Sequence, residues 1–196
     1  MSPLVSVEPM RRSRSLPWAG SLLGSILDYR TLPKTQLQLP IFGYVAVRGL
    51  GLDDFDAAAD LIERGIVEGY LAPRTPEQIE RVLESAFGAF IGGNHLAGLG
   101  TLLTYGDDQA AEVASLYTLT RFLGEGVGSH LVRFAAERAS GQGCRFVFAC
   151  TTSPRVEAFF ERNGFRKVDS SEVPEAKWRA YDPARRAQVV CLRRDL

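Results

Sequence analysis

The sequence has few of the features that mark proteins for nucleic acids, membranes or metals. Lysine plus arginine and aspartate plus glutamate each number 23, so the chain has no overall attraction for nucleic acid or for an anionic lipid surface. No apolar run approaches the roughly 20 residues that are needed to span a bilayer. With two histidines and no close spacing of cysteine and histidine, we expect no metal site.

Cysteine is also scarce, and its positions are informative. Cys144, Cys150 and Cys191 all lie in apolar, strand-like runs, and their number is odd. This usage predicts reduced, buried thiols in a cytoplasmic protein rather than a framework of disulfides. The apolar fraction of 45% and the charged fraction of 23% are those of an ordinary soluble protein, and 196 residues suffice for one domain with its own core.

The first 40 residues differ from the rest of the chain. A basic cluster at residues 11–14 precedes an apolar stretch at residues 16–27, but glycine and serine dilute that stretch and no small-residue cleavage site follows it. These features argue against a targeting signal. We interpret residues 1–40 as an N-terminal extension: a disordered arm, an oligomer contact, or residues ahead of the true start codon. Residues 41–196 form the predicted folded domain.

The order of elements in that domain predicts an α/β fold with a mixed sheet. Strands are expected at residues 44–48, 87–91, 96–105, 112–119, 145–150, 165–168 and 188–192. Helices are expected at residues 55–66, 76–87, 127–140, 154–163 and 174–181. The second helix has the clearest start signal, because Thr75 stands at the cap position and Pro76 at the first helical position. Strands and helices in this order fit one central sheet with helices on both faces.

The most informative segment is the glycine-spaced turn at residues 123–128, which follows a strand and leads into a helix. The first N–H groups of a helix have no partner within it, and together with the helix dipole they attract an anion. No Gly-Lys-Ser/Thr sequence follows, which excludes a nucleotide-hydrolysing P-loop. The position past mid-chain is also wrong for a dinucleotide fold. The turn therefore predicts a pyrophosphate site such as that for coenzyme A, and the alternative is a simple tight turn.

This arrangement resembles the GCN5-related N-acetyltransferase (GNAT) family. Gly124, Gly126 and Gly128 match the glycines of the family's pyrophosphate turn, and Leu123 stands where the family has Arg or Gln. Within the family, residues 47–195 are most similar to the acetyltransferase domain of N-acetylglutamate synthases. Three segments carry this resemblance: residues 71–80, residues 111–114, and the long tail that runs from residue 151 to residue 189.

The resemblance implies a fold, a reaction and a cofactor. The fold would be a central mixed sheet in which the fourth and fifth strands splay apart. The reaction would be acetyl transfer from acetyl-CoA to the α-amino group of L-glutamate, the first step of arginine biosynthesis. Most such synthases carry an amino-acid-kinase-like domain ahead of this one. With about 40 residues before the domain, the resemblance implies a short, stand-alone form without the arginine feedback site of that domain.

The resemblance also assigns the cofactor residues. Backbone N–H groups of residues 116–119 would meet the acetyl carbonyl and the pantetheine arm, and those of residues 124–129 would bind the pyrophosphate. The residues are Leu116, Tyr117, Thr118, Leu119, Gly124, Glu125, Gly126, Val127, Gly128 and Ser129. Phe159 and its aromatic neighbours on the following helix are interpreted as core or as packing beside the pantetheine.

Glu112 and two arginines are the predicted site for the acceptor. Glu112 matches the glutamate of the family's fourth strand and is the candidate general base, acting through a water; the alternative is a solvated glutamate at a strand edge. Arg74 and Arg185 match the arginines that bind the acceptor's carboxylates, and the alternative for each is a surface charge. Ala187 stands where the family has Ser, which puts the identity of the acceptor in doubt.

Further candidates come from the loop after the fifth strand and from the tail. Thr152 and Ser153 are the candidate donors of the proton to the leaving thiolate, and Tyr117 is a third. Lys177 and Tyr181 either shape the acceptor pocket or pack the end of the chain. Two alternatives stay open for the whole protein: another small amine, amino acid or protein amine as acceptor, or a non-catalytic acyl-CoA-binding module. The fold suggests a homodimer through the sheet edge or the N-terminal extension.

Overall fold

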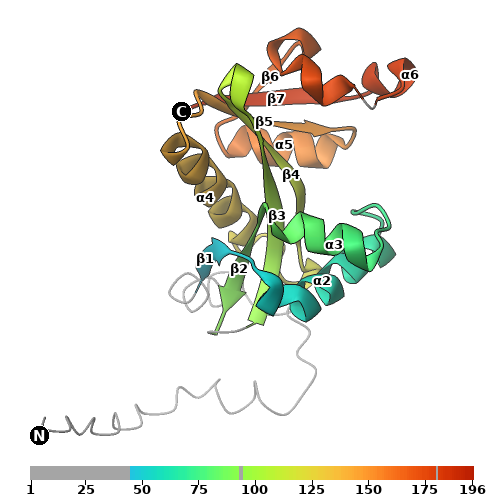
Figure 1. The fold of residues 1–196 in the computed structure, drawn as a ribbon, viewed down its shortest axis with the longest axis vertical. Helices are drawn as coiled ribbons and strands as arrows, with labels where there is room; N and C mark the ends of the chain where they lie inside the picture. Colours follow the sequence, from blue (N-terminus) through green and yellow to red (C-terminus); the bar gives the residue numbers. More distant parts are fainter. Residues whose placement is uncertain (1–44, 93–94, 180) are drawn as a thin grey trace, which may run out of the picture. The chain divides into compact units, whose positions relative to one another are not determined.

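The computed structural model describes residues 45–92, 95–179 and 181–196, and the predicted extension lies outside these residues. The described strands form one mixed seven-stranded sheet in the order β1-β2-β3-β4-β5-β7-β6 (Figure 1). Neighbouring strands are antiparallel except β4 and β5, which are parallel. The strands are β1 (Ala46–Gly49), β2 (Ala86–Ile91), β3 (His95–Tyr105), β4 (Ala110–Thr118), β5 (Phe146–Thr151), β6 (Arg166–Val168) and β7 (Val190–Asp195). The predicted mixed sheet is confirmed.

Helices cover both faces of this sheet (Figure 1). The α-helices are α2 (Phe55–Val67), α3 (Pro76–Leu83), α4 (Val127–Gly141), α5 (Pro154–Arg162) and α6 (Pro183–Arg186). The 3-10 turns are η1 (Leu52–Asp54), η2 (Gly106–Asp108), η3 (Thr120–Phe122), η4 (Ser170–Glu172) and η5 (Glu175–Trp178). Within the described ranges, no helix has the length and apolar character to cross a membrane.

The core is divided between the two faces by the alternation of side chains along each strand. In β2, Phe87 and Ala89 pack with α4 and α5, whereas Ala86 and Phe90 pack with α2 and α3. A third cluster extends the α2 face beneath η4 and η5, and Trp178 is one of its buried members. Burial on both faces explains why β2 and the first half of β5 read as continuous apolar runs rather than as alternating ones.

Local signals in the sequence account for where most helices begin. The Thr75 hydroxyl accepts a hydrogen bond from the Gln78 N–H at 3.4 Å, and the Gln78 side chain accepts one from the Thr75 N–H at 2.9 Å. This reciprocal pair is a capping box, and it confirms the predicted start of α3. Helix α3 ends at Leu83, however, and not at residue 87 as predicted, because Phe87 belongs to β2.

Two predictions for the tail were wrong. The helix expected at residues 174–181 is only the short turn η5, and α6 was not expected at all. Helix α6 is too short to show helical periodicity, and Asp182 starts it by accepting the Ala184 N–H at 2.7 Å. The last strand begins at Val190 rather than at residue 188, because the N–H groups of Gln188 and Val189 bond back to α6.

The buried face of β7 should be critical for stability, and a matched leucine pair tests this. Leu192 is fully buried in the main core, whereas Leu52 in η1 is 72% exposed. We expect Leu192→Ala to lower the free energy of unfolding by about 2–5 kcal/mol, because it removes apolar contacts and leaves a cavity. Leu52→Ala should change it by less than about 0.5 kcal/mol. Urea denaturation followed by circular dichroism measures both, and equal effects would contradict this account of the core.

Candidate active site

An opening in the sheet lies between β4 and β5. The two parallel strands are paired only where Ala110, Ala111 and Glu112 face Phe146, Val147 and Phe148. Beyond Glu112, β4 continues through residue 118 and, within the described ranges, pairs with β3 alone. The backbone of β4 facing β5 is therefore free to bind a ligand, as the predicted splay of the fourth and fifth strands requires.

A bulge in β4 changes the face of the sheet that its later side chains occupy. Ser115 has a φ of +51°, and the register with β3 shifts between Leu99 and Thr101. The extra residue reverses the alternation of side chains. As a result, Leu116 packs with the α4 face, whereas Tyr117 packs with the α2 face on which Glu112 also lies. Glu112 and Tyr117 thus share a face although they are an odd number of residues apart.

The glycine turn has the geometry of an anion cradle at the start of α4. Gly124 and Gly126 have φ values of +87° and +84°, which other residues adopt only with strain. The first bond within α4 runs from the His130 N–H to the Gly126 carbonyl, at 3.0 Å. The N–H groups of residues 127–129 therefore point out of the helix end, where an anion would be bound.

Gly128 serves a different purpose from the other two glycines. A Cβ atom at this position would lie 3.1 Å from the Phe159 ring, so the glycine permits close packing between α4 and α5. The Phe159 ring is itself packed edge-on against Phe160, with ring centroids 5.3 Å apart. Glu125, between the positive-φ glycines, is buried, and its Oε2 has no hydrogen-bond partner among the described residues.

Glu112 is buried at the point where β4 and β5 part. The Glu112 residue is 2% exposed, and its Oε1 accepts a hydrogen bond from Lys177 Nζ at 2.5 Å. Its Oε2 accepts one from the Tyr105 hydroxyl at 3.0 Å. The alternative of a solvated strand-edge glutamate is therefore wrong. Whether Glu112 is the base stays a prediction.

Arg74 reaches the bulge of β4 from the loop between α2 and α3. Its Nη2 donates to the Ser115 hydroxyl at 2.7 Å, while its buried Nη1 has no partner among the described residues. Burial lowers the pKa of this guanidinium from its usual value, which still leaves it charged. A charged donor without an acceptor is costly to bury, and a bound carboxylate would relieve that cost.

The tail places the other predicted acceptor residues in one row. The Lys177 ammonium lies 5.0 Å from the centre of the Tyr181 ring, and the Arg185 guanidinium lies 5.1 Å from the same ring. Arg185 is exposed, as an acceptor ligand would need to be before binding. Lys177 is not a free cation for substrate, because it is paired with Glu112.

The three candidate proton donors differ in their surroundings. Thr152 is exposed, and Ser153 is half-buried at the start of α5, where its N–H donates to the Thr151 hydroxyl at 3.0 Å. Tyr117 is buried, and its hydroxyl has no hydrogen-bond partner in the described ranges. Burial and the neighbouring Glu68 carboxylate raise the pKa of Tyr117 to about 12, so it keeps its proton at neutral pH.

Sequence reasoning missed Tyr105 and Ser115 as partners of the site. Tyr105 could have been found by counting through the β3–β4 hairpin, because it faces Ala110 and is thus two positions from the residue that faces Glu112. Ser115 carried no comparable signal, since the bulge on which it lies becomes visible only in the register of β3 and β4. No group of three metal-ligating side chains occurs in the part of the chain that the structure describes.

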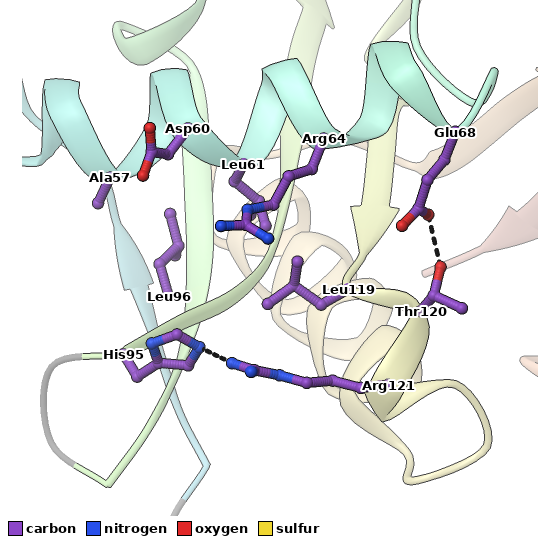
Figure 2. A pocket seen from close by; sticks show the side chains of 10 residues that line it. All are labelled: Ala57, Asp60, Leu61, Arg64, Glu68, His95, Leu96, Leu119, Thr120 and Arg121. Carbon is purple, nitrogen blue, oxygen red and sulfur yellow. Dashed lines mark hydrogen bonds between the residues drawn. The ribbon is translucent and has the colours of Figure 1, made fainter. Parts of the chain in front are cut away.

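A separate pocket of about 380 Å³ lies between α2 and η3 (Figure 2). Leu61, Leu96 and Leu119 form its apolar floor. Arg64 and Arg121 supply positive charge around it, and Arg121 contacts the His95 ring. Burial lowers the pKa of His95, and the two arginine charges lower it further. Apart from Leu119, the predicted site residues do not line this pocket.

A family profile identifies the chain at this point. The profile of the Acetyltransferase (GNAT) family matches residues 55–165, which run from α2 through the glycine turn to just beyond α5. The chain belongs to the GNAT family. This GNAT chain therefore shares the acetyltransferase fold that its strand order and its parted β4–β5 pair show.

Two related proteins of similar sequence are both amino-acid acetyltransferases. Over 146 residues the chain is 30% identical to an amino-acid acetyltransferase from Photobacterium profundum, covering 74% of this chain and 32% of that protein. It is 27% identical, with the same coverage, to an amino-acid acetyltransferase from Vibrio cholerae. The chain thus spans about a third of the length of these relatives.

Solved structures of similar proteins agree with membership of the GNAT family. N-acetylglutamate synthase from Neisseria gonorrhoeae, complexed with coenzyme A and N-acetyl-glutamate, is 27% identical with a TM-score of 0.68, over 78% of this chain and 35% of that one. A GNAT acetyltransferase from Staphylococcus aureus is 15% identical with a TM-score of 0.63, over 78% of this chain and 99% of that one. The likeness to the Staphylococcus aureus protein concerns the fold alone.

The glycine turn should control the affinity for coenzyme A, and α4 itself supplies the control. Gly126→Ala places a side chain at a φ of +84°, so the N–H groups of the cradle must move. We expect the Kd for coenzyme A to rise about tenfold or more, since this strain costs about 1–2 kcal/mol. Gly141→Ala, where an added Cβ meets nothing within 4 Å, should leave it unchanged. Isothermal titration calorimetry measures both; equal affinities would remove the turn from the site.

Proposed function

We propose that the chain transfers the acetyl group of acetyl-CoA to the α-amino group of L-glutamate, the first step of arginine biosynthesis. The observation that carries the proposal is the Arg74 guanidinium, which is held against β4 with one buried N–H unpaired among the described residues. It lies on the α2 face of the sheet, as does the buried Glu112 carboxylate. A carboxylate ligand and a base are the two groups that an amino-acid acceptor requires. The similarity to N-acetylglutamate synthase supports the choice of acceptor.

The reaction is a direct attack. The acceptor's ammonium group loses a proton to Glu112 through a water, and its nitrogen then bonds to the thioester carbonyl carbon. Backbone N–H groups of β4 after the bulge stabilise the oxyanion of the tetrahedral intermediate. The carbon–sulfur bond then breaks. The leaving thiolate takes a proton from Thr152, Ser153 or Tyr117, and that donor recovers a proton from the nitrogen, which must lose its second proton to become the amide.

Glutamate brings two carboxylates, and the site offers two arginines from different elements. Arg74 approaches from the α2–α3 loop, whereas Arg185 projects from α6 over the Tyr181 ring. Ala187 at the end of α6 offers no hydroxyl for a further hydrogen bond. This favours a second candidate, in which the same chemistry acts on another small amine or amino acid.

The decisive experiment measures thiol release from acetyl-CoA with each of the standard amino acids. We expect release with glutamate, and we expect Arg74→Ala and Arg185→Ala each to raise the KM for glutamate about tenfold or more, because each removes a charged hydrogen bond to a carboxylate. Arg81→Ala is the matched control, since Arg81 is exposed on α3 and its side chain donates only to the Glu77 carbonyl among the contacts described for it.

The outcomes separate the candidates. Release with an uncharged or cationic acceptor, unaffected by the two arginine variants, would overturn the choice of glutamate while keeping acetyl transfer. Binding of coenzyme A without release for any acceptor would point to the non-catalytic module. An equal loss in Arg81→Ala would show that the arginine variants act on folding.

A further inference from the structure

The partner of Glu112 is the least expected feature of the site. Lys177 comes from η5, sixty-five residues further along the chain, and its Nζ lies 2.5 Å from Glu112 Oε1. Both side chains are largely removed from water, with exposed fractions of 12% for Lys177 and 3% for Glu112. Taking two charges out of water is costly unless the pair has good geometry and further hydrogen bonds. This pair has both.

Tyr105 completes the fixation of the carboxylate. Its hydroxyl donates to Oε2 at 3.0 Å, so each oxygen of Glu112 has one donor and the carboxylate plane is defined by contacts from β3 and η5. Each carboxylate oxygen has a second lone pair. A water that carries the acceptor's proton can therefore still be bound without breaking either contact.

The Glu112–Lys177 pair is linked through Tyr181 to Arg185, a candidate ligand of the acceptor. The Lys177 ammonium and the Arg185 guanidinium lie 5.0 Å and 5.1 Å from the centre of the same Tyr181 ring. Cation–π contacts of this kind hold both cations on one aromatic surface. Glu112, Lys177, Tyr181 and Arg185 thus form a continuous series from the candidate base to a candidate acceptor ligand.

The groups around the pair favour its charged form. Burial lowers the pKa of Lys177, but the charge and hydrogen bond of Glu112 outweigh it, and the net pKa is raised. The Lys177–Glu112 pair therefore makes its full contribution to the stability of the fold below the pKa of an unfolded lysine. This contribution is lost only as the pH rises through the higher pKa of the folded state. Tyr105, Cys150 and Tyr181 also face the pair, and Cys191 lies behind Cys150 with the two sulfurs 3.9 Å apart. Burial raises the pKa of Tyr105, so this phenol stays neutral.

We propose that Lys177 is a positioning residue of the acetyl-transfer reaction: it supplies the positive charge that pairs with the buried Glu112 carboxylate, it fixes that carboxylate at the point where β4 and β5 part, and it ties it through Tyr181 to Arg185. The inference rests on the proposed function, because it takes Glu112 as the base. Lys177 does not touch the acceptor in this account. Its contribution is the charge and the contacts that it gives to Glu112 and Tyr181.

The first test compares Lys177→Met with the wild type in the thiol-release assay across pH. We expect kcat to fall about tenfold or more while the KM for acetyl-CoA stays unchanged, because only the step that uses the base is affected. The acidic limb of the kcat profile should move to higher pH, since a buried carboxylate without its cation is more easily protonated. Lys177→Arg should restore most of kcat and the position of the limb.

Two further variants separate positioning from folding. Lys167→Ala removes a lysine whose ion pair with Glu157 is largely at the surface, and it should alter neither kcat nor the pH limb. Lys177→Gln keeps a hydrogen-bond donor without the charge. It replaces Lys177→Met in the assay if Lys177→Met does not fold. Loss of kcat in proportion to the folded fraction, with an unmoved pH limb, would overturn the proposal.

A measurement without turnover distinguishes failure of this inference from failure of the proposed function. Infrared difference spectra of protein whose glutamates carry ¹³C report the carboxylate of Glu112, assigned by the disappearance of its band in Glu112→Gln. In Lys177→Met the band should become that of a protonated carboxyl at a higher pH than in the wild type. An unchanged band would overturn the inference even if acetyl transfer to glutamate is found. A shifted band in a protein without transfer would instead leave the pairing role of Lys177 in place and overturn the reaction assigned to the site.

Discussion

The parting of β4 and β5 is the constraint on which the rest of the site depends. These strands share a parallel pairing of only three residues, whereas every other neighbouring pair in the described sheet is antiparallel. Past Glu112, backbone N–H and C=O groups of β4 face an opening instead of a partner strand. Buried backbone groups must find hydrogen-bond partners, so the opening has to be filled by water or by a ligand. The sheet thereby creates a ligand site at its centre without a dedicated loop.

The electrostatics of the opening follow from that geometry. A carboxylate buried at the point where β4 and β5 part needs compensating donors, and Lys177 and Tyr105 supply them from two different elements. Arg74, by contrast, keeps a buried N–H without a partner in the described structure beside the bulge. The site therefore combines one closed ion pair with one open cation. Such an arrangement would attract the anionic acceptor that we propose, although the chain as a whole has no net charge.

The sequence was sufficient for features set by local or periodic signals. The glycine turn, the cap of α3 and most of the strands rest on residues close together in the chain, and the structure has them where they were predicted. The Glu112–Lys177 pair could not be predicted from the sequence, because it joins residues that only the sheet register brings together. The packing role of Gly128 was missed for the same reason, since its neighbour Phe159 lies on another helix. The short turn η5 and helix α6 have too few residues for a period to appear.

The position of β7 explains how the tail comes to supply Lys177. Strand β7 is inserted between β5 and β6, so the segment from residue 169 to residue 189 leaves the sheet at its edge and must return past β6 to reach β5. On this path it crosses the α2 face, where Trp178 packs against the buried side chains of β4, β5 and β7. The Trp178 N–H also donates to the Ser170 carbonyl at 3.2 Å, which closes the segment on itself. Because Lys177 directly precedes this anchored tryptophan, its ammonium group is delivered to Glu112 by the topology of the sheet and not by a flexible loop.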